Sequence, residues 1–395
     1  MDVLTLERAK PALPFAGSYQ LLDFSLSNLV NSGVTDVWLS VQYQASALEE
    51  QAHNGRPWDL DRTRGGLRLL VPQQGAGSMD EEGFAQGNAD ELYRLRDQIR
   101  RADPELVVVM SADHVYRLDY RDVIATHREK GAEVTMVVTD VDGTYAENAG
   151  DHAVVETNRL GRVTGFAYKP DDPATTTVAT EVIVYDPSVL VQVLEELHHG
   201  LSDEPDEGDD DEGDSGLGDF GDLLVPRLVD RGKAYSHRLE GYWRDLGQPH
   251  HYLNAHLELL EGDAGLFHSD WPLSTQQPQR EPARVLDGAR ISESLLSSGC
   301  VVAGEVSRSV IGPGVVVEAG AVVDQSVVFP DTAIRAGARV VRSIIDADCE
   351  LLDGALVGTS EVDLSDPDAI PIVGRESRVG SVVPAGGRLA PGTTA

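Results

Sequence analysis

Two aspartates lie at positions where their carboxylates could bind a metal ion. Asp113 follows the apolar run 106–110 by three residues, just beyond the C-terminal end of an expected buried strand, where open α/β sheets bind ligands. Asp245 lies in segment 241–247, whose aromatic residues and bounding glycines favour a shaped loop. Two carboxylates on separate loops are a usual way to hold Mg²⁺ beside substrate phosphates. A helix cap or turn aspartate is the alternative for Asp113.

Lysine is rare in this chain, so each lysine inside a motif is a candidate functional residue. Of the 32 basic residues only four are lysines, namely Lys10, Lys130, Lys169 and Lys233. Arg8 and Lys10 precede Pro11, which disfavours helix at the lysine, and two cations on an extended segment would suit a triphosphate. Lys169 precedes Pro170 at the end of a strand-like run. A solvated surface lysine is the alternative at either position.

A third candidate is a run of small residues at an expected helix start. Gly87-Asn88-Ala89-Asp90 opens the helical pattern 90–101, and a helix N-terminus with small residues can accept a nucleobase or a phosphate. Other chemistries are disfavoured. The histidines at 198–199, 250–251 and 256 have no recognised zinc spacing, and no Gly-x-Ser-x-Gly elbow occurs.

Composition bounds the classes of protein that remain. The 395 residues are enough for two or three domains, and 66 acidic residues against 32 basic ones give a formal charge of -34. That field repels phosphate backbones and anionic lipid, so we expect no nucleic-acid or membrane partner. Only two cysteines occur, and the N-terminus lacks the order of a secretory signal, so a cytoplasmic protein is expected.

The elements that must position these residues follow from hydrophobic periodicity. Up to about residue 250, short β-branched runs (36–41, 106–110, 133–139 and 181–185) alternate with amphipathic helical patterns (20–31, 90–101, 120–130, 188–197 and 221–231). This alternation predicts an α/β domain of parallel strands with helical crossovers over 1–250. The acidic segment 203–214 cannot bury enough apolar surface to order itself and is expected to be a mobile loop.

A second pattern begins after a helical and Pro-rich linker over 251–282. Aliphatic residues recur at every sixth position from Val310 to Val340, and Ser-aliphatic-aliphatic triplets begin at Ser309, Ser326 and Ser343, 17 residues apart. Because one triangular coil takes about three hexapeptides, both periods predict a left-handed parallel β-helix over 283–375. A β-sandwich would show a period of two. The residues 376–395 are expected to be a tail.

The motifs taken together resemble the bacterial glucose-1-phosphate adenylyltransferases, also called ADP-glucose pyrophosphorylases. Single motifs are moderately specific, whereas the ordered set spans nearly the whole chain. The matching landmarks are Arg8-Ala9-Lys10-Pro11-Ala12, residues 23–28, Asn31-Ser32-Gly33, residues 87–90, residues 111–116, residues 166–170, Asp219-Phe220-Gly221, Tyr242-Trp243-Arg244-Asp245 and the hexapeptide repeats.

The resemblance implies a Rossmann-like nucleotidyltransferase domain that makes ADP-glucose and pyrophosphate from ATP and glucose 1-phosphate, for glycogen synthesis. It implies Mg²⁺ held by Asp113 and Asp245, with Asp113 and Lys10 as catalytic residues, and a homotetramer or a hetero-oligomer with a paralogue. It also implies that substrates are bound by Lys169, Arg8, Gly87, Asn88, Asp90, Gln73, Tyr168, Trp243 and Arg244.

The chain also departs from the family pattern. Members of the family carry a glycine-rich phosphate loop with an arginine immediately before the position of Met1, so we expect the natural start to lie upstream; a cut chain or an inactive protein are the alternatives. On the sugar side, the family's tyrosine, its glutamate beside the lysine, its Ser-Met-Gly run and its histidine correspond here to Ala85, Tyr168, Ala179-Thr180-Glu181 and Gly218. The nucleotide and metal half of the resemblance is therefore better supported than the identity of the sugar.

Three alternatives to ADP-glucose synthesis stay open at this point. A non-catalytic regulatory paralogue would explain the altered sugar contacts, and another sugar 1-phosphate or base would do so as well. An acyltransferase built on the β-helix is disfavoured, because such enzymes usually need a histidine as general base and none occurs between Gly299 and Glu361.

Overall fold

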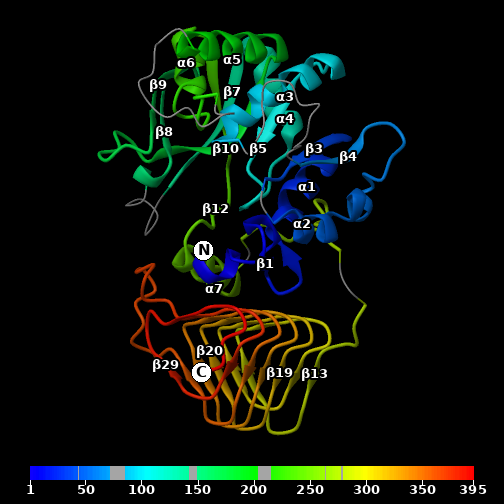
Figure 1. Cartoon of the computed structure of the whole chain (residues 1–395), viewed down its shortest axis with the longest axis vertical. Coiled ribbons are helices and arrows are strands. Elements are labelled where there is room, and N and C mark those ends of the chain that lie inside the picture. Colours follow the sequence, from blue (N-terminus) through cyan, green and yellow to red (C-terminus); the bar gives the residue numbers. More distant parts are fainter. Residues whose placement is uncertain (43, 72–84, 142–148, 203–214, 263, 277–278) are drawn as a thin grey trace.

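The computed structural model describes residues 1–42, 44–71, 85–141, 149–202, 215–262, 264–276 and 279–395. A mixed α/β part extends to helix α7 (Pro249–Glu261), and a parallel β-helix begins at strand β13 (Arg284–Val285). Figure 1 shows the two parts stacked along the long axis of the molecule, with α7 and the N-terminal segment between them. The acidic segment 203–214 lies outside the described residues. No helix in the described ranges has the length and apolarity needed to cross a bilayer.

The elements of the first part follow the predicted helices closely and add several short pieces. The helices before α7 are α1 (Leu21–Asn31), α2 (Ala45–Ala52), α3 (Asn88–Ala102), α4 (Tyr120–Lys130), α5 (Pro187–Ser202) and α6 (Leu224–Asp230). The 3₁₀ helices are η1 (Asp2–Thr5), η2 (Lys10–Ala12) and η3 (His53–Trp58). The strands are β1 (Pro14–Phe15), β2 (Tyr19–Gln20), β3 (Asp36–Ser40), β4 (Gly66–Leu70), β5 (Val107–Met110), β6 (His114–Tyr116), β7 (Val134–Asp140), β8 (Ala153–Thr157), β9 (Val163–Tyr168), β10 (Thr177–Tyr185), β11 (Ala234–Arg238) and β12 (Trp243–Asp245).

The central sheet is mixed, so the prediction of parallel strands was wrong in part. Its order is β11-β7-β10-β8-β9, with β5 pairing along β10. Strands β7 and β11 are parallel, but β10 lies between β5 and β7 and runs antiparallel to both. The sequence could not show this, because a strand buried on both faces gives a continuous apolar run whichever way it runs. One face packs against α1 and α4, and the other against α3, α5 and α6.

The C-terminal part is a β-helix built from three parallel sheets. The first sheet contains β13, β16 (Val301–Val302), β19 (Val316–Val317), β22 (Ala333–Ile334), β25 (Glu350–Leu351) and β28 (Arg378–Val379). The second contains β14 (Arg290–Ser292), β17 (Glu305–Ser307), β20 (Val322–Asp324), β23 (Arg339–Val341), β26 (Leu356–Val357) and β29 (Val382–Val383). The third contains β15 (Leu295–Leu296), β18 (Val310–Ile311), β21 (Val327–Val328), β24 (Ile344–Ile345), β27 (Ile372–Val373) and β30 (Arg388–Leu389).

The 17-residue period describes the coils better than the six-residue period. Val310 pairs with Val327, Val316 with Ala333 and Val322 with Arg339, each 17 residues on. The inward side chains are Ile311, Val317, Val323, Val328, Ile334 and Val340, so one side of each coil is a residue shorter than the others. The predicted tail at 376–395 is wrong, because β28, β29 and β30 continue the three sheets as the last coil.

The third sheet of the β-helix joins the two parts of the molecule. Its outward residues Val310, Val327, Ile344 and Ile372 are as apolar as its inward ones and are fully or almost fully buried. They form one core cluster with the N-terminal segment and with Tyr252 and Leu253 of α7. Burying apolar surface on both faces of this sheet fixes the N-terminal segment, and with it Lys10, against the rest of the fold.

Candidate active site

The two candidate metal carboxylates are brought together by a two-stranded ladder. Asp113 lies in the turn between β5 and β6, and β6 pairs antiparallel with β12, which places Asp245 opposite His114. The predicted loop at Asp245 is therefore a strand. Local pattern could not show it, because each strand has three residues and its partner is distant in sequence. Asp113 and Asp245 consequently lie side by side, as the metal hypothesis requires.

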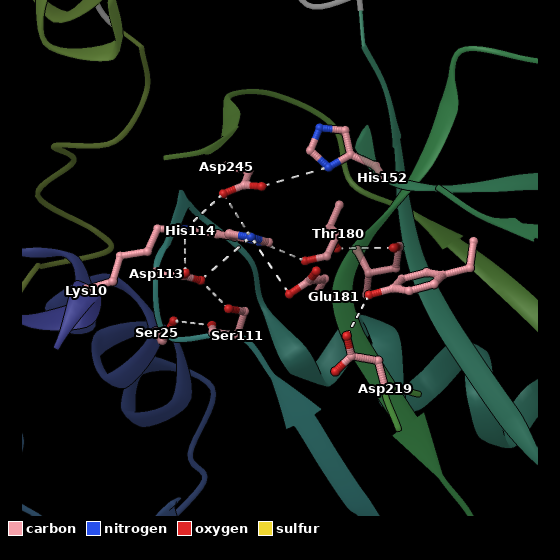
Figure 2. A network of polar contacts seen from close by, with 12 residues as sticks. Lys10, Ser25, Ser111, Asp113, His114, His152, Thr180, Glu181, Asp219 and Asp245 are labelled. Atoms are coloured by element: carbon pink, nitrogen blue, oxygen red, sulfur yellow. Dashed lines mark hydrogen bonds and ion pairs between the residues drawn. The ribbon is translucent and has the colours of Figure 1, made fainter. Parts of the chain in front are cut away.

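Lys10 lies between these two carboxylates. Its Nζ is 2.6 Å from Asp113 Oδ2 and 3.4 Å from Asp245 Oδ1 (Figure 2). Burial alone would lower the pKa of Lys10, but the two carboxylates outweigh it and raise that pKa. The segment that carries Lys10 is not extended as predicted, since Lys10 begins η2 with Pro11 in its first turn, a position that tolerates proline.

His114 is a buried cation partner that the sequence analysis missed. Its Nδ1 donates to the carbonyl oxygen of Thr180 at 3.2 Å, so its Nε2 is left to face Asp245 at 3.5 Å and Asp113 at 3.7 Å. Burial would lower the pKa of His114, but the surrounding carboxylates raise it overall. Its place directly after Asp113, at the start of a strand, was the available signal.

The charges of this cluster keep both carboxylates ionised. Burial would raise the pKa of Asp245, yet the positive charges of His114 and Lys10 hold it well below its usual range. For Asp113 the same opposition of burial by Lys10 and His114 lowers the pKa. His152 Nδ1 lies 3.9 Å from Asp245 Oδ2, but burial lowers the pKa of His152, so the positive charge of the cluster comes from His114 and Lys10. Nothing in the sequence pattern had singled out His152.

The donor set fits a magnesium ion that is completed by substrate. Two carboxylate oxygens already converge on one cationic atom, Lys10 Nζ, at 2.6 and 3.4 Å. Among the described residues, no group of three or more histidine, cysteine or acidic side chains is arranged to hold a metal. Mg²⁺ is usually held by one or two carboxylates together with phosphate oxygens and water, so two aspartates are a sufficient protein contribution.

A cavity of about 500 Å³ lies at the start of α3, where a nucleotide site was predicted. Its lining includes Ser40, Ala85, Gly87 and Asn88. Position 87 has no room for a side chain, because a Cβ there would lie 2.3 Å from the carbonyl of Gly218. Asn88 holds the loop that follows Gly218, since its Oδ1 accepts from Phe220 N–H and its own N–H donates to Asp219 Oδ1 at 3.3 Å.

The side chains expected to bind the sugar adjoin the cavity through Asp219, whose Oδ1 accepts from Asn88 N–H. The Tyr168 hydroxyl donates to Asp219 Oδ2 at 3.0 Å, and Lys169 Nζ lies 5.0 Å from the centre of the Tyr168 ring. Burial and the neighbouring Asp219 charge raise the pKa of Tyr168. The hydroxyl is thus held as a donor to Asp219. Glu181 lies between this pair and the metal carboxylates, 3.9 Å from His114 Nε2.

Several predicted substrate-binding residues have other partners in the structure. Arg8 is 9% exposed and forms a buried ion pair with Asp346 of the β-helix, a partner that the prediction of a triphosphate contact did not include. Arg244 turns toward α7, where its Nε is 3.0 Å from Glu258 Oε2. These two cations were indistinguishable from phosphate ligands because their partners are distant in sequence or on another element.

Two further predictions concern side chains that lie behind the site. Asp90 is fully buried, and its Oδ2 accepts from Gln86 N–H at 2.9 Å and from Arg94 Nε at 3.1 Å, so it supports the loop before α3 instead of lining the cavity. Trp243 is 4% exposed and packs edge-on against the rings of His114 and His152, which positions both histidines. Gln73 lies outside the described residues.

Comparison with known proteins gives the family of each part. Residues 2–262 match the family described as nucleotidyl transferase, and residues 282–366 match the family described as GlmU-like, C-terminal hexapeptide. A glucose-1-phosphate adenylyltransferase of Thermomicrobium roseum is 37% identical over 76% of this chain and 67% of its own length. Enzymes of the same name from Thermotoga neapolitana (37% identical, 82% of this chain, 73% of its own length) and Bacillus cereus (32%, 82% and 82%) match similarly.

Proposed function

This chain belongs to the nucleotidyl transferase family that includes the glucose-1-phosphate adenylyltransferases, and from that premise we propose that it makes ADP-glucose and pyrophosphate from ATP and glucose 1-phosphate. The observation that carries the proposal is the convergence of Asp113 and Asp245 on Lys10. The cavity at the start of α3 offers a place for the nucleotide. Two anionic substrates can meet there only if their charges are screened.

The proposed reaction needs no nucleophile from the protein. An oxygen of the sugar phosphate attacks the α-phosphorus of ATP, and pyrophosphate leaves in line. The main barrier is electrostatic, because two unit like charges 4 Å apart repel by about 4 kcal/mol at an effective dielectric constant of 20. When bound, a magnesium ion held by Asp113 and Asp245 would supply part of the screening.

The residues of the chain supply the remaining screening and the alignment. Lys10 is a buried cation whose partners are two carboxylates, so it can turn toward phosphate oxygens when a metal takes those carboxylates over. Lys169, whose Nζ lies over the Tyr168 ring, would bind the phosphate of the sugar. Holding both substrates in the reacting geometry converts a bimolecular reaction into an effectively unimolecular one.

The test is the release of pyrophosphate from ATP and glucose 1-phosphate over a series of magnesium concentrations. We expect release to require all three components and to stop when the metal is chelated. The assay is run on this chain and on a form extended by the codons before Met1, with other sugar 1-phosphates and nucleoside triphosphates as parallel substrates. Absence of release from both forms with every substrate pair would contradict the proposal.

The wider setting belongs to the same proposal. ADP-glucose made here would serve the synthesis of glycogen or another α-glucan in the cytoplasm, which is consistent with two buried cysteines that form no disulfide. We propose a homotetramer, or a hetero-oligomer with a paralogue, on the resemblance alone. Light scattering of the purified protein gives the size of the assembly, and a monomer would contradict this part.

A further inference from the structure

Glu181 occupies the one place in β10 where this strand changes its partners. On one edge, the register with β7 shifts between Ala179 and Ile183. On the other edge, β8 pairs at Val178 and β5 takes over from Val182. Glu181 itself has a φ of +58°, a left-handed conformation that strains a residue with a side chain. Bulges of this kind re-aim a side chain.

The re-aimed side chain points into the candidate active site. Figure 2 shows the Glu181 carboxylate between Asp113 and Asp219, on the side of His114 away from Lys10. The side chain is 35% exposed, and its Oε2 lies 3.9 Å from His114 Nε2. It accepts no hydrogen bond from any described residue, although Asp113, Asp245 and Asp219 each accept at least one.

The surroundings of Glu181 decide what it can bind. Lys10 and His114 lie closer to Asp113 and Asp245 than to Glu181, so those aspartates already balance their positive charges. Attraction to these two cations therefore does not explain why Glu181 keeps a strained backbone. A phosphate would be repelled by this carboxylate. Asp113 and Asp245 already supply the two carboxylates that a magnesium ion completed by substrate needs, so a metal does not require Glu181. A neutral hydroxyl donor remains.

We propose that Glu181 accepts a hydrogen bond from one hydroxyl of the sugar and thereby determines which sugar 1-phosphate the site takes. This inference rests on the proposed function, and it adds the residue that distinguishes one sugar from another. The Tyr168 hydroxyl already donates to Asp219 at 3.0 Å, whereas the Glu181 carboxylate has no hydrogen-bond donor among the described residues. A site built to hydrogen-bond a substrate hydroxyl discriminates strongly against the analogue that lacks that hydroxyl.

Two substitutions separate recognition from folding. Glu181→Gln removes the charge and keeps the shape, and Glu181→Gly also relieves the positive φ, so its unfolding midpoint should equal or exceed that of the wild type. Glu293→Gly is the matched control, because Glu293 has a φ of +44° and lies between β14 and β15 in the first coil of the β-helix. The control should leave all substrate constants unchanged.

The measurement is kcat/KM for glucose 1-phosphate and for analogues that lack one hydroxyl at a time, with ATP saturating. We expect the wild type to lose about tenfold or more on one analogue, since hydrogen bonds to charged groups are that strong. Glu181→Gly should use this analogue and the parent sugar about equally, while KM for ATP changes less than twofold. If both variants keep the wild-type discrimination, the inference is overturned and the proposed function stands.

Equilibrium binding of the same series, measured by calorimetry, covers the case of a protein that does not turn over. Loss of discrimination in the Glu181 variants would support the inference on binding alone. If the wild type neither releases pyrophosphate nor binds any sugar 1-phosphate, the proposed function and this inference both fall. Discrimination that survives in both variants would again overturn the inference alone.

Discussion

At the scale of single residues, Lys10 is the cation that the two carboxylates share. Its ammonium group lies within 3.4 Å of both Asp113 and Asp245, and without it two buried negative charges would repel each other. In a chain with a formal charge of -34, a locally cationic point must be assembled from specific side chains. Lys10 and His114 are those side chains here.

This arrangement predicts a strong effect of neutralising either carboxylate. Asp113→Asn and Asp245→Asn should each lower the rate of pyrophosphate release at least about 100-fold, because a metal contact worth several kcal/mol in the transition state is lost. The dependence of the rate on magnesium concentration should move to higher concentrations in both variants. Asp270→Asn, which changes an exposed carboxylate outside the site, should behave as the wild type. Near-normal rates in both site variants would show that the metal is held elsewhere.

At the scale of elements, His256 joins α7 to the β1–β2 hairpin. Its Nδ1 donates to the Tyr252 carbonyl at 2.8 Å, and its Nε2 accepts from Ala16 N–H at 3.2 Å. Complete burial lowers the pKa of His256 to about 4, against an ordinary value of 6.5. A proton on Nε2 would face the N–H of Ala16, so the neutral ring is the one that fits.

The depressed pKa of His256 predicts a pH dependence of stability. The unfolded chain binds a proton here more readily than the folded chain, so the stabilisation is complete above pH 6.5 and is lost as the pH falls toward 4. His256→Gln keeps an acceptor and removes the titration. Denaturant unfolding from pH 7.5 to 4 should show the wild type losing up to about 3 kcal/mol relative to this variant.

The exposed residue His268 provides the matched control for that series. His268→Gln should run parallel to the wild type over the whole pH range, because its ring is not enclosed by the fold. If the wild type and His256→Gln also stay parallel, the imidazole of His256 does not couple folding to protons.

The loop at the start of α3 gives a second prediction at this scale. Gly87→Ala would place a Cβ 2.3 Å from the Gly218 carbonyl, so the two loops that meet there must separate. We expect KM for ATP to rise about tenfold or more, with a smaller change for the sugar phosphate, because the cavity lining moves. Gly200→Ala is the control, since nothing lies within 4 Å of its added Cβ. Equal KM values for ATP in the two variants would show that the nucleotide does not bind in this cavity.

Sequence pattern predicted the elements better than their partners. The apolar run before Asp113 indicated a strand end, and the 17-residue spacing of Ser309, Ser326 and Ser343 indicated the coils, whose buried serines stack so that each N–H donates to the hydroxyl one coil away. The antiparallel course of β10 and the pairing of β6 with β12 could not be predicted, because both depend on contacts between distant segments. Glu181 stood out only as a departure from a family pattern, since no local signal marks a strand that changes partners.

At the scale of the whole molecule, the ion pair between Arg8 and Asp346 ties the N-terminal segment to the β-helix. Both side chains are buried, with exposures of 10% and 1%, and Arg8 also lies over the ring of Phe329. Burial raises the pKa of Asp346, which Arg8 opposes. Because Lys10 follows Arg8 by two residues, this pair helps to hold Lys10 in place.

The position of this pair predicts that the β-helix influences both stability and catalysis. Removing one partner leaves a buried charge unpaired, so Arg8→Met or Asp346→Leu should each lower the free energy of unfolding by about 3–5 kcal/mol. The double variant should recover most of that loss, because two apolar side chains of similar size can pack there.

Turnover should not recover in the same way. It should fall in Arg8→Met and stay low in the double variant, because neither variant has the ion pair that fixes the segment carrying Lys10. Exposed Arg290→Met, on the first coil, controls for the loss of a positive charge. Additive losses of stability in the double variant would show that Arg8 and Asp346 act independently, and normal turnover in Arg8→Met would show that the β-helix does not position Lys10.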